Sequence, residues 1–155
     1  MSLSIRALCE HDINQLLDFQ VSPQDAHWSL NQLSDALDQC EKGCYLALVA
    51  VDISTQKIIG YAIASYFGEQ ADIQNILVTQ TSRGRGAGRL LMTQLVSILN
   101  SLSVASIFLE VRASNLAAVN LYVSLGFEQI QKRRNYYPGV HGDREDALVF
   151  SLACQ

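Results

Sequence analysis

The chain has 155 residues, of which 49% are hydrophobic and 17% are charged. These values predict a single folded domain over residues 1–155 and exclude an intrinsically disordered chain. The net charge of −4 argues against direct binding to nucleic acid, since nucleic-acid binders usually carry a basic face. The same charge suits a basic peptide or an amine as a partner.

Membrane association and metal binding are also disfavoured. No apolar run approaches the ~20 residues that cross a bilayer, and the N-terminus lacks the long apolar region of a signal peptide. We therefore expect a cytoplasmic protein with no membrane partner. Cys9, Cys40, Cys44 and Cys154 lack paired Cys-x-x-Cys spacing, and only three histidines accompany them. Neither a metal site nor a disulfide framework is expected.

The first half of the chain predicts two short helices and four strands. Alternating apolar residues predict a strand at residues 4–8, and Asp12 and Ser29 are expected to cap the two helices. Three apolar runs then follow, joined by short connections, at residues 45–51, 58–67 and 71–78. Short links between consecutive strands predict an antiparallel meander.

The second half predicts alternation of helices and strands. Leu91, Leu95, Ile98 and Leu102 fall on one face of a helix, and a strand follows at residues 106–111. A strand–helix–strand crossover normally makes its two strands parallel. A helix at residues 115–124 and strands at 127–136 and 145–152 complete the pattern. We predict a mixed α/β fold with a central sheet of six to seven strands flanked by about four helices.

A glycine-rich segment between the third apolar run and the long helix is the main functional motif. It reads Arg83, Gly84, Arg85, Gly86, Ala87, Gly88 and Arg89. A strand, a glycine turn and a helix start form a phosphate-binding arrangement, because the first-turn N–H groups and the helix dipole face the anion. Neither a Rossmann fingerprint nor a Walker A loop fits the spacing. The segment predicts a pyrophosphate site; the alternative is a turn whose arginines are only solvated.

Further stretches match one family in order and spacing. The pattern Arg83-x-x-Gly86-x-Gly88 resembles the acetyl-CoA loop of the GNAT acetyltransferases, and residues 109–115, 118–122 and 125–127 resemble the C-terminal half of that fold. The tail at residues 133–138 and 142–147 resembles the branch that acetylates the N-terminal alanine of ribosomal protein S18. The resemblance extends from Trp28 to Ala147.

The resemblance implies a function and a role for each matching residue. It implies the GNAT fold, acetyl-CoA as co-substrate without a metal, and the N-terminal peptide of ribosomal protein S18 as acceptor. The main chain of Ile76, Leu77 and Val78 would pair with the pantetheine arm. Arg83, Gly84, Arg85, Gly86, Ala87, Gly88 and Arg89 would hold the pyrophosphate, and Asn115 would bind near the thioester. Glu110 would be the general base and Tyr122 the general acid.

Other readings of these residues stay open from the sequence alone. Alternation could place Glu110 on a solvent face, Tyr122 could be a packing residue, and Asn115 could serve only as a helix cap. The acceptor could be another protein N-terminus, a lysine or a small amine, and the chain could bind CoA without turnover. Acidic residues lie in or near segments that could bind a basic peptide, namely Glu69, Asp72, Asp143, Glu145 and Asp146.

Overall fold

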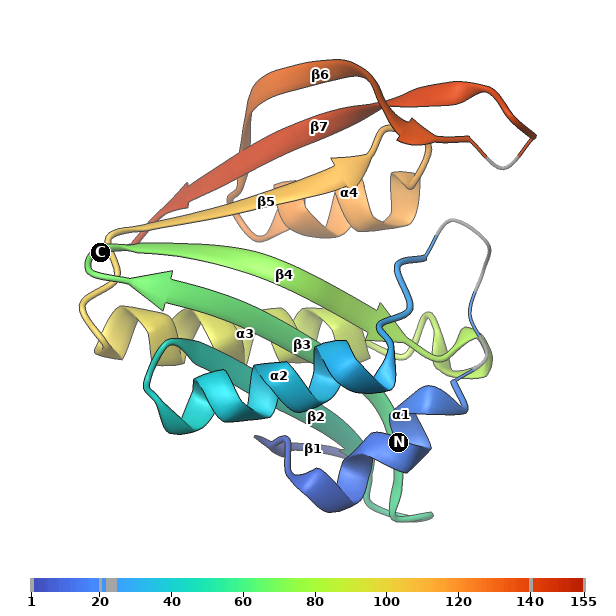
Figure 1. Ribbon diagram of the computed structural model, residues 1–155, viewed down its shortest axis with the longest axis vertical. Coiled ribbons are helices and arrows are strands. Elements are labelled where there is room, and N and C mark those ends of the chain that lie inside the picture. The colour runs from blue at the N-terminus through green and yellow to red at the C-terminus, as the bar shows by residue number, and fades with distance from the viewer. Residues whose placement is uncertain (1, 20, 22–24, 140, 155) are drawn as a thin grey trace.

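The computed structural model describes residues 2–19, 21, 25–139 and 141–154. One seven-stranded sheet has the order β1-β2-β3-β4-β5-β7-β6 (Figure 1). The strands are β1 (Leu3–Ala7), β2 (Tyr45–Asp52), β3 (Lys57–Phe67), β4 (Gln70–Val78), β5 (Ser106–Arg112), β6 (Glu128–Pro138) and β7 (Arg144–Ala153). The helices are α1 (Ile13–Leu17), α2 (Leu30–Glu41), α3 (Ala87–Ser101) and α4 (Leu116–Ser124), with short 3-10 turns η1 (Glu10–Asp12) and η2 (Gln80–Ser82). The predicted mixed α/β fold is confirmed.

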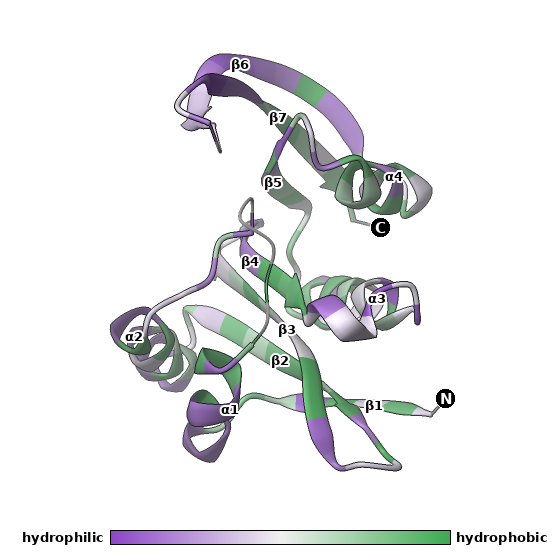
Figure 2. Cartoon of the chain, turned by 90° about the vertical axis from the view of Figure 1, so that its right-hand side faces the viewer, coloured by the Kyte–Doolittle hydropathy of each residue, from purple (hydrophilic) through white to green (hydrophobic). Residues whose placement is uncertain are grey.

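The helices form two layers around the sheet. α1 and α2 cover one face and α3 and α4 the other (Figure 1). Leu91 and Leu95 of α3 pack in one buried cluster, and Leu16 of α1 and Leu33 of α2 pack in a second cluster on the opposite face. β2 and β3 contribute alternate residues to both clusters, which explains their nearly continuous apolar sequence (Figure 2).

The N-terminal segment departs from one prediction. Ser29 caps α2 as expected, because its side chain accepts a hydrogen bond from the Gln32 backbone N–H at 3.2 Å. Asp12 precedes α1 but makes no capping hydrogen bond with its side chain. Its carboxylate instead accepts two hydrogen bonds from Arg6 at 2.8 and 2.9 Å. No helix in the described part of the chain is long and apolar enough to cross a membrane.

β4 and β5 separate soon after they meet. The two strands are parallel, as the crossover predicts, and their last register pair joins Asp72 to Phe108. Beyond that pair the two strands diverge (Figure 1). A register shift at Ile63 and Ala64 of β3 leaves Gln74 as an extra residue in β4. Such a bulge bends a strand and increases its local twist, so it directs the end of β4 away from β5.

A second irregularity shapes β6. The register with β7 shifts between Arg133 and Tyr137, and Asn135 in this segment has a φ of 51°. The Asn135 backbone N–H donates to Asp146 Oδ1 at 3.0 Å, and Arg144 donates to the Asn135 and Tyr136 carbonyls at 2.7 and 2.8 Å. These bonds satisfy backbone groups that the bulge removes from the ladder, and they fix the position of Tyr137.

Candidate active site

The glycine segment joins β4 to the N-terminus of α3. Gly84 and Gly86 have φ values of 77° and 82°, a region that glycine adopts without strain. Gly86 is the N-cap of α3 and supplies no side chain to its first-turn N–H groups. A Cβ added at either glycine would meet open space within 4 Å. The segment therefore leaves its backbone accessible in the manner of an anion-binding helix start.

A cavity of about 390 Å³ adjoins this segment, and we call it the cofactor cavity. Its walls include almost all of the cofactor-binding residues that the sequence predicts, namely Ile76, Leu77, Val78, Arg83, Gly84, Gly86, Ala87, Gly88, Arg89 and Asn115. Arg85 does not line it and forms an ion pair with Asp52 at 3.6 Å.

The other two arginines of the segment also have protein partners. Arg83 forms an ion pair with Asp25, and Arg89 donates a hydrogen bond to Ser124 Oγ at 2.6 Å. Both nevertheless line the cofactor cavity. Their positive charges therefore lie beside the N-terminus of α3. The helix dipole gives this end of the helix a partial positive charge as well.

One edge of β4 faces the gap between the diverging strands. Ile76, Leu77 and Val78 pair with β3 on one side. On their other side, β4 has no register pair with β5 beyond Asp72. An exposed strand edge offers N–H and C=O groups to an extended ligand.

α4 supplies two of the predicted residues. Asn115 caps this helix, since its Oδ1 accepts a hydrogen bond from the Ala118 N–H at 3.3 Å. Tyr122 is buried, with its ring centroid 5.9 Å from that of Phe127 and 6.4 Å from that of Phe150. Burial raises the pKa of Tyr122, and the nearby Tyr137 adds to the increase. Asn115 and Tyr122 thus have structural contacts and line the cofactor cavity as well.

A smaller cavity of about 160 Å³ lies between β4 and β5. Glu110, Tyr122 and Asn115 all line it. It shares Tyr122 and Asn115 with the cofactor cavity, so the two are adjacent. The structure therefore brings together both predicted catalytic residues, which lie on different elements.

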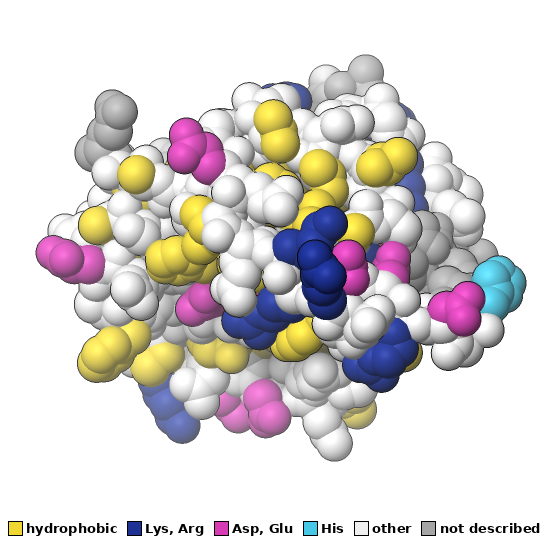
Figure 3. All heavy atoms as spheres, turned by 90° about the horizontal axis from the view of Figure 1, so that it is seen from above, with side chains coloured by type: hydrophobic (Ala, Val, Ile, Leu, Met, Phe, Trp, Pro, Cys, Tyr) yellow, Lys and Arg dark blue, Asp and Glu magenta, His cyan; other side chains and the backbone are white. Residues whose placement is uncertain are grey.

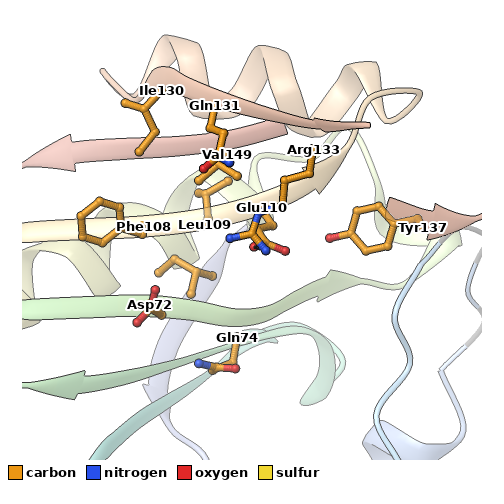
Figure 4. Close-up of a pocket in the computed structure, with 11 residues that line it drawn as sticks. Asp72, Gln74, Phe108, Leu109, Glu110, Ile130, Gln131, Arg133, Tyr137 and Val149 are labelled. Atoms are coloured by element: carbon orange, nitrogen blue, oxygen red, sulfur yellow. Dashed lines mark ion pairs between the residues drawn. The ribbon is translucent and has the colours of Figure 1, made fainter. Parts of the chain in front are cut away.

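A third cavity of about 510 Å³ adjoins the smaller one and shares Glu110 with it, and we call it the acceptor cavity (Figure 4). Asp72 and Gln74 of β4 line it, facing Phe108 and Glu110 of β5 and Arg133 of β6. Glu110 is exposed rather than packed in the core, and Arg133 Nη1 lies 3.1 Å from its Oε1.

Arg112 organises the rim near the acceptor cavity. It donates hydrogen bonds to Glu145 at 3.0 Å and to the Pro138 carbonyl at 2.7 Å. Its guanidinium carbon lies 4.5 Å from the centroid of the Tyr137 ring, and Tyr137 lines the cavity. The sequence alone did not identify Arg112, because its partners lie on β6 and β7. The register of these strands cannot be inferred from the sequence of one strand.

Asn75 is a second residue that sequence reasoning missed. It is buried and lines the cavity between β4 and β5, and its Nδ2 donates to the Ala26 carbonyl at 2.6 Å. Its Oδ1 is buried without a hydrogen-bond partner in the described structure. The sequence feature that could have identified Asn75 is its polar side chain inside the apolar run at residues 73–78.

A strand edge, a glycine-rich helix start and a carboxylate–tyrosine pair lie around one gap, which is the arrangement expected of an acyl-CoA-dependent transferase. The model of the acetyltransferase (GNAT) family matches residues 11–127, and the chain belongs to this family.

Similar proteins cover nearly the whole chain. The [ribosomal protein bS18]-alanine N-acetyltransferase of Haemophilus ducreyi is 32% identical, covering 96% of this chain and 98% of the relative. The enzyme of the same name from Salmonella typhimurium is 37% identical, with coverages of 82% and 88%. The crystal structure of the Escherichia coli ribosomal-protein-S18-alanine N-acetyltransferase superposes with a TM-score of 0.86 at 31% identity, covering 99% of this chain and 95% of that one.

The contact between Arg112 and Glu145 predicts a pH-dependent loss of stability. Hydrogen bonds from Ser114 and Arg112 lower the pKa of Glu145 against the opposing effect of desolvation. Their stabilisation is complete above the ordinary glutamate pKa of about 4.3 and disappears as the pH falls through the lowered value. We expect Arg112→Met to reduce the free energy of unfolding by about 1 kcal/mol at pH 7 and by less at pH 3.5, as measured by urea denaturation.

Arg134→Met is the matched control, because Arg134 is exposed on the same strand as the bulge. It should change the free energy of unfolding by less than about 0.5 kcal/mol at either pH. An equal loss for Arg112→Met at both pH values would assign the effect to the Tyr137 and Pro138 contacts instead of the carboxylate.

Proposed function

We propose that this chain transfers the acetyl group of acetyl-CoA to the α-amino group of the N-terminal alanine of ribosomal protein S18. In this proposal Glu110 is the general base, Tyr122 is the general acid, and the chain acts as one domain in the cytoplasm. The main support for this proposal is the cavity between β4 and β5. Glu110 and Tyr122 both line it, and it adjoins the cofactor cavity and the acceptor cavity. The proposed substrate is that of similar enzymes that align with nearly the whole chain.

The residues around the cofactor cavity fit the chemical groups of acetyl-CoA. The exposed edge of β4 at Ile76, Leu77 and Val78 would pair with the amides of the pantetheine arm. The backbone at Gly84, Gly86 and Gly88 would approach the pyrophosphate, with Arg83 and Arg89 adding positive charge. Asn115 would bind near the thioester while it caps α4. Acetyl-CoA supplies the acetyl group in an activated form.

Glu110 would accept the proton that the acceptor amine must lose. A peptide α-amino group has a pKa of about 7.7–8.0, against about 10.4 for lysine, so its deprotonation costs roughly 3.5 kcal/mol less. The Glu110 carboxylate is exposed to the acceptor cavity and can take the proton directly or through a water. A moderate base therefore suffices for an N-terminal acceptor.

Tyr122 would donate a proton to the departing sulfur. The raised pKa of Tyr122 keeps its hydroxyl protonated at neutral pH, so a proton is available. A thiol has a pKa of about 8.5, which makes the thiolate a weaker base than the phenolate of a tyrosine. Protonation of the sulfur would therefore accompany cleavage of the carbon–sulfur bond as the tetrahedral intermediate collapses to the amide, and Tyr122 would regain its proton from solvent. Phe127 and Phe150 hold the ring in place.

Mass spectrometry of an acetylation mixture tests the function. Enzyme and acetyl-CoA are incubated with a peptide of the S18 N-terminal sequence and with the same peptide blocked at its α-amino group. We expect one added acetyl group on the free peptide and none on the blocked one. Acetylation of both peptides would place the transfer on a lysine. Transfer to neither, with acetyl-CoA still bound, would contradict the proposed acceptor.

Glu110→Gln tests the base. We expect kcat/KM for the peptide to fall about 100-fold at pH 7 and by a smaller factor near pH 9.5, where the amine is largely neutral without help. The Kd for acetyl-CoA should stay within about twofold, since Glu110 does not line the cofactor cavity. Glu128→Gln, an exposed change at the far end of β6, is the matched control. Unchanged catalysis in Glu110→Gln would remove Glu110 from the base role.

Gly86→Ala tests the cofactor cavity. An added methyl group would enter open space beside the N-terminus of α3 and strain a backbone with a φ of 82°. We expect the Kd for CoA to rise about tenfold by calorimetry, which corresponds to about 1.4 kcal/mol. Gly68→Ala is the control, because Gly68 has a φ of 59° and lies in the β3–β4 turn outside the cavity. Equal Kd values for the two variants would argue against close backbone approach at Gly86.

A further inference from the structure

The acceptor cavity has an unbalanced negative charge. Its charged residues are Asp72, Glu110 and Arg133. Arg133 pairs with Glu110 at 3.1 Å, so these two charges largely cancel. Asp72 is left, and its carboxylate has no ion-pair or hydrogen-bond partner within the described structure. Partial burial alone raises the pKa of Asp72, without a compensating cation.

The other acidic residues that could attract a basic acceptor are placed differently. Glu145 pairs with Arg112 at 3.0 Å, and Asp146 lies 3.8 Å from Lys132 and accepts the Asn135 N–H. Acidic and basic side chains lie side by side on the face of the molecule seen in Figure 3. Glu69 and Asp143 lie outside the acceptor cavity. Asp72 is thus the carboxylate of this set that faces the acceptor and is not already paired.

The position of Asp72 suits contact with the second residue of an acceptor peptide. Asp72 is the register partner of Phe108, and Glu110 lies two residues further along the same face of β5 (Figure 4). Two residues of a strand span about 7 Å. An acceptor whose α-amino group lies at Glu110 has its second Cα one residue away, about 3.8 Å from the first. A lysine or arginine side chain there, with a reach on the order of 6 Å, spans the distance to Asp72.

We propose that Asp72 is a specificity-determining residue that selects acceptors with an arginine or lysine directly after the N-terminal residue. This inference rests on the proposed function, because it assumes that an N-terminal α-amino group lies at Glu110. The basic side chain gains a charge-assisted hydrogen bond in a partly desolvated cavity. It also neutralises the carboxylate that the fold leaves unpaired. An acidic second residue meets like charge and is disfavoured.

Four peptides with a common neutral tail test the proposal. They begin Ala-Arg-Ala, Ala-Ala-Ala, Ala-Glu-Ala and Ala-Ala-Arg, and arginine is used because its side chain is not a competing amine. We expect kcat/KM for Ala-Arg-Ala to exceed that for Ala-Ala-Ala about tenfold, with Ala-Glu-Ala the poorest. High salt should reduce the difference. A preference for Ala-Ala-Arg, or no preference, would overturn the proposal.

Substitutions at Asp72 assign the preference to this side chain. Asp72→Asn should reduce the advantage of Ala-Arg-Ala over Ala-Ala-Ala from about tenfold to about twofold. Asp72→Lys should favour Ala-Glu-Ala over Ala-Arg-Ala, a reversal that a merely structural role of Asp72 would not produce. Asp35→Asn, an exposed change of the same kind on α2, should keep the original order. An unchanged arginine preference in Asp72→Asn would refute the role.

Binding measured without turnover separates this inference from the proposed function. The Kd of each peptide is determined by calorimetry in the presence of CoA, which cannot donate an acetyl group. An arginine preference in Kd that depends on Asp72, with no acetyl transfer in the assay, would contradict the proposed function alone. Transfer to all four peptides with equal Kd and equal kcat/KM would contradict the role of Asp72 alone.

Discussion

The separation of β4 and β5 is the constraint on which the site depends. Two neighbouring strands normally satisfy each other's backbone groups, and leaving that pairing is costly in a buried sheet. Here the pairing stops at Asp72 and Phe108, and the bulge at Gln74 directs β4 away. The opening creates the exposed edge at residues 76–78, and it admits side chains from β5 and α4 to the same gap. A continuous sheet would have neither feature.

Several residues at the gap combine a structural contact with a place in the site. Asn115 caps α4, Tyr122 packs against Phe127 and Phe150, and Gly86 is the N-cap of α3. Each is held by contacts that belong to the fold, so its functional atoms are positioned before a substrate binds. Preorganisation of this kind reduces the cost of arranging the groups during the reaction. The structural contacts of Asn115 and Tyr122 are therefore compatible with the cofactor-binding and general-acid roles proposed for them.

The sequence predicted the fold more completely than the side-chain contacts of the site. Periodicity and turn lengths were enough for the meander, the crossover helix and the glycine segment, because these patterns are local. The pairing of Arg133 with Glu110, and of Arg112 with Glu145, depends on the registers of β6 and β7. The shift between Arg133 and Tyr137 breaks the two-residue alternation, so the sequence of β6 alone does not predict which side chains face β5.

Charge pairing around the acceptor cavity decides what an incoming substrate encounters. The arginines near it are engaged by the protein: Arg133 by Glu110, Arg112 by Glu145, and Arg144 by two backbone carbonyls of the β6 bulge. Free guanidinium groups would repel a protonated amine, whereas groups held in ion pairs repel it much less. The same pairing cancels most of the nearby carboxylates, and Asp72 remains. In the role proposed for Asp72, this one unpaired side chain on β4 sets the charge preference of the cavity, although the rim is rich in basic residues.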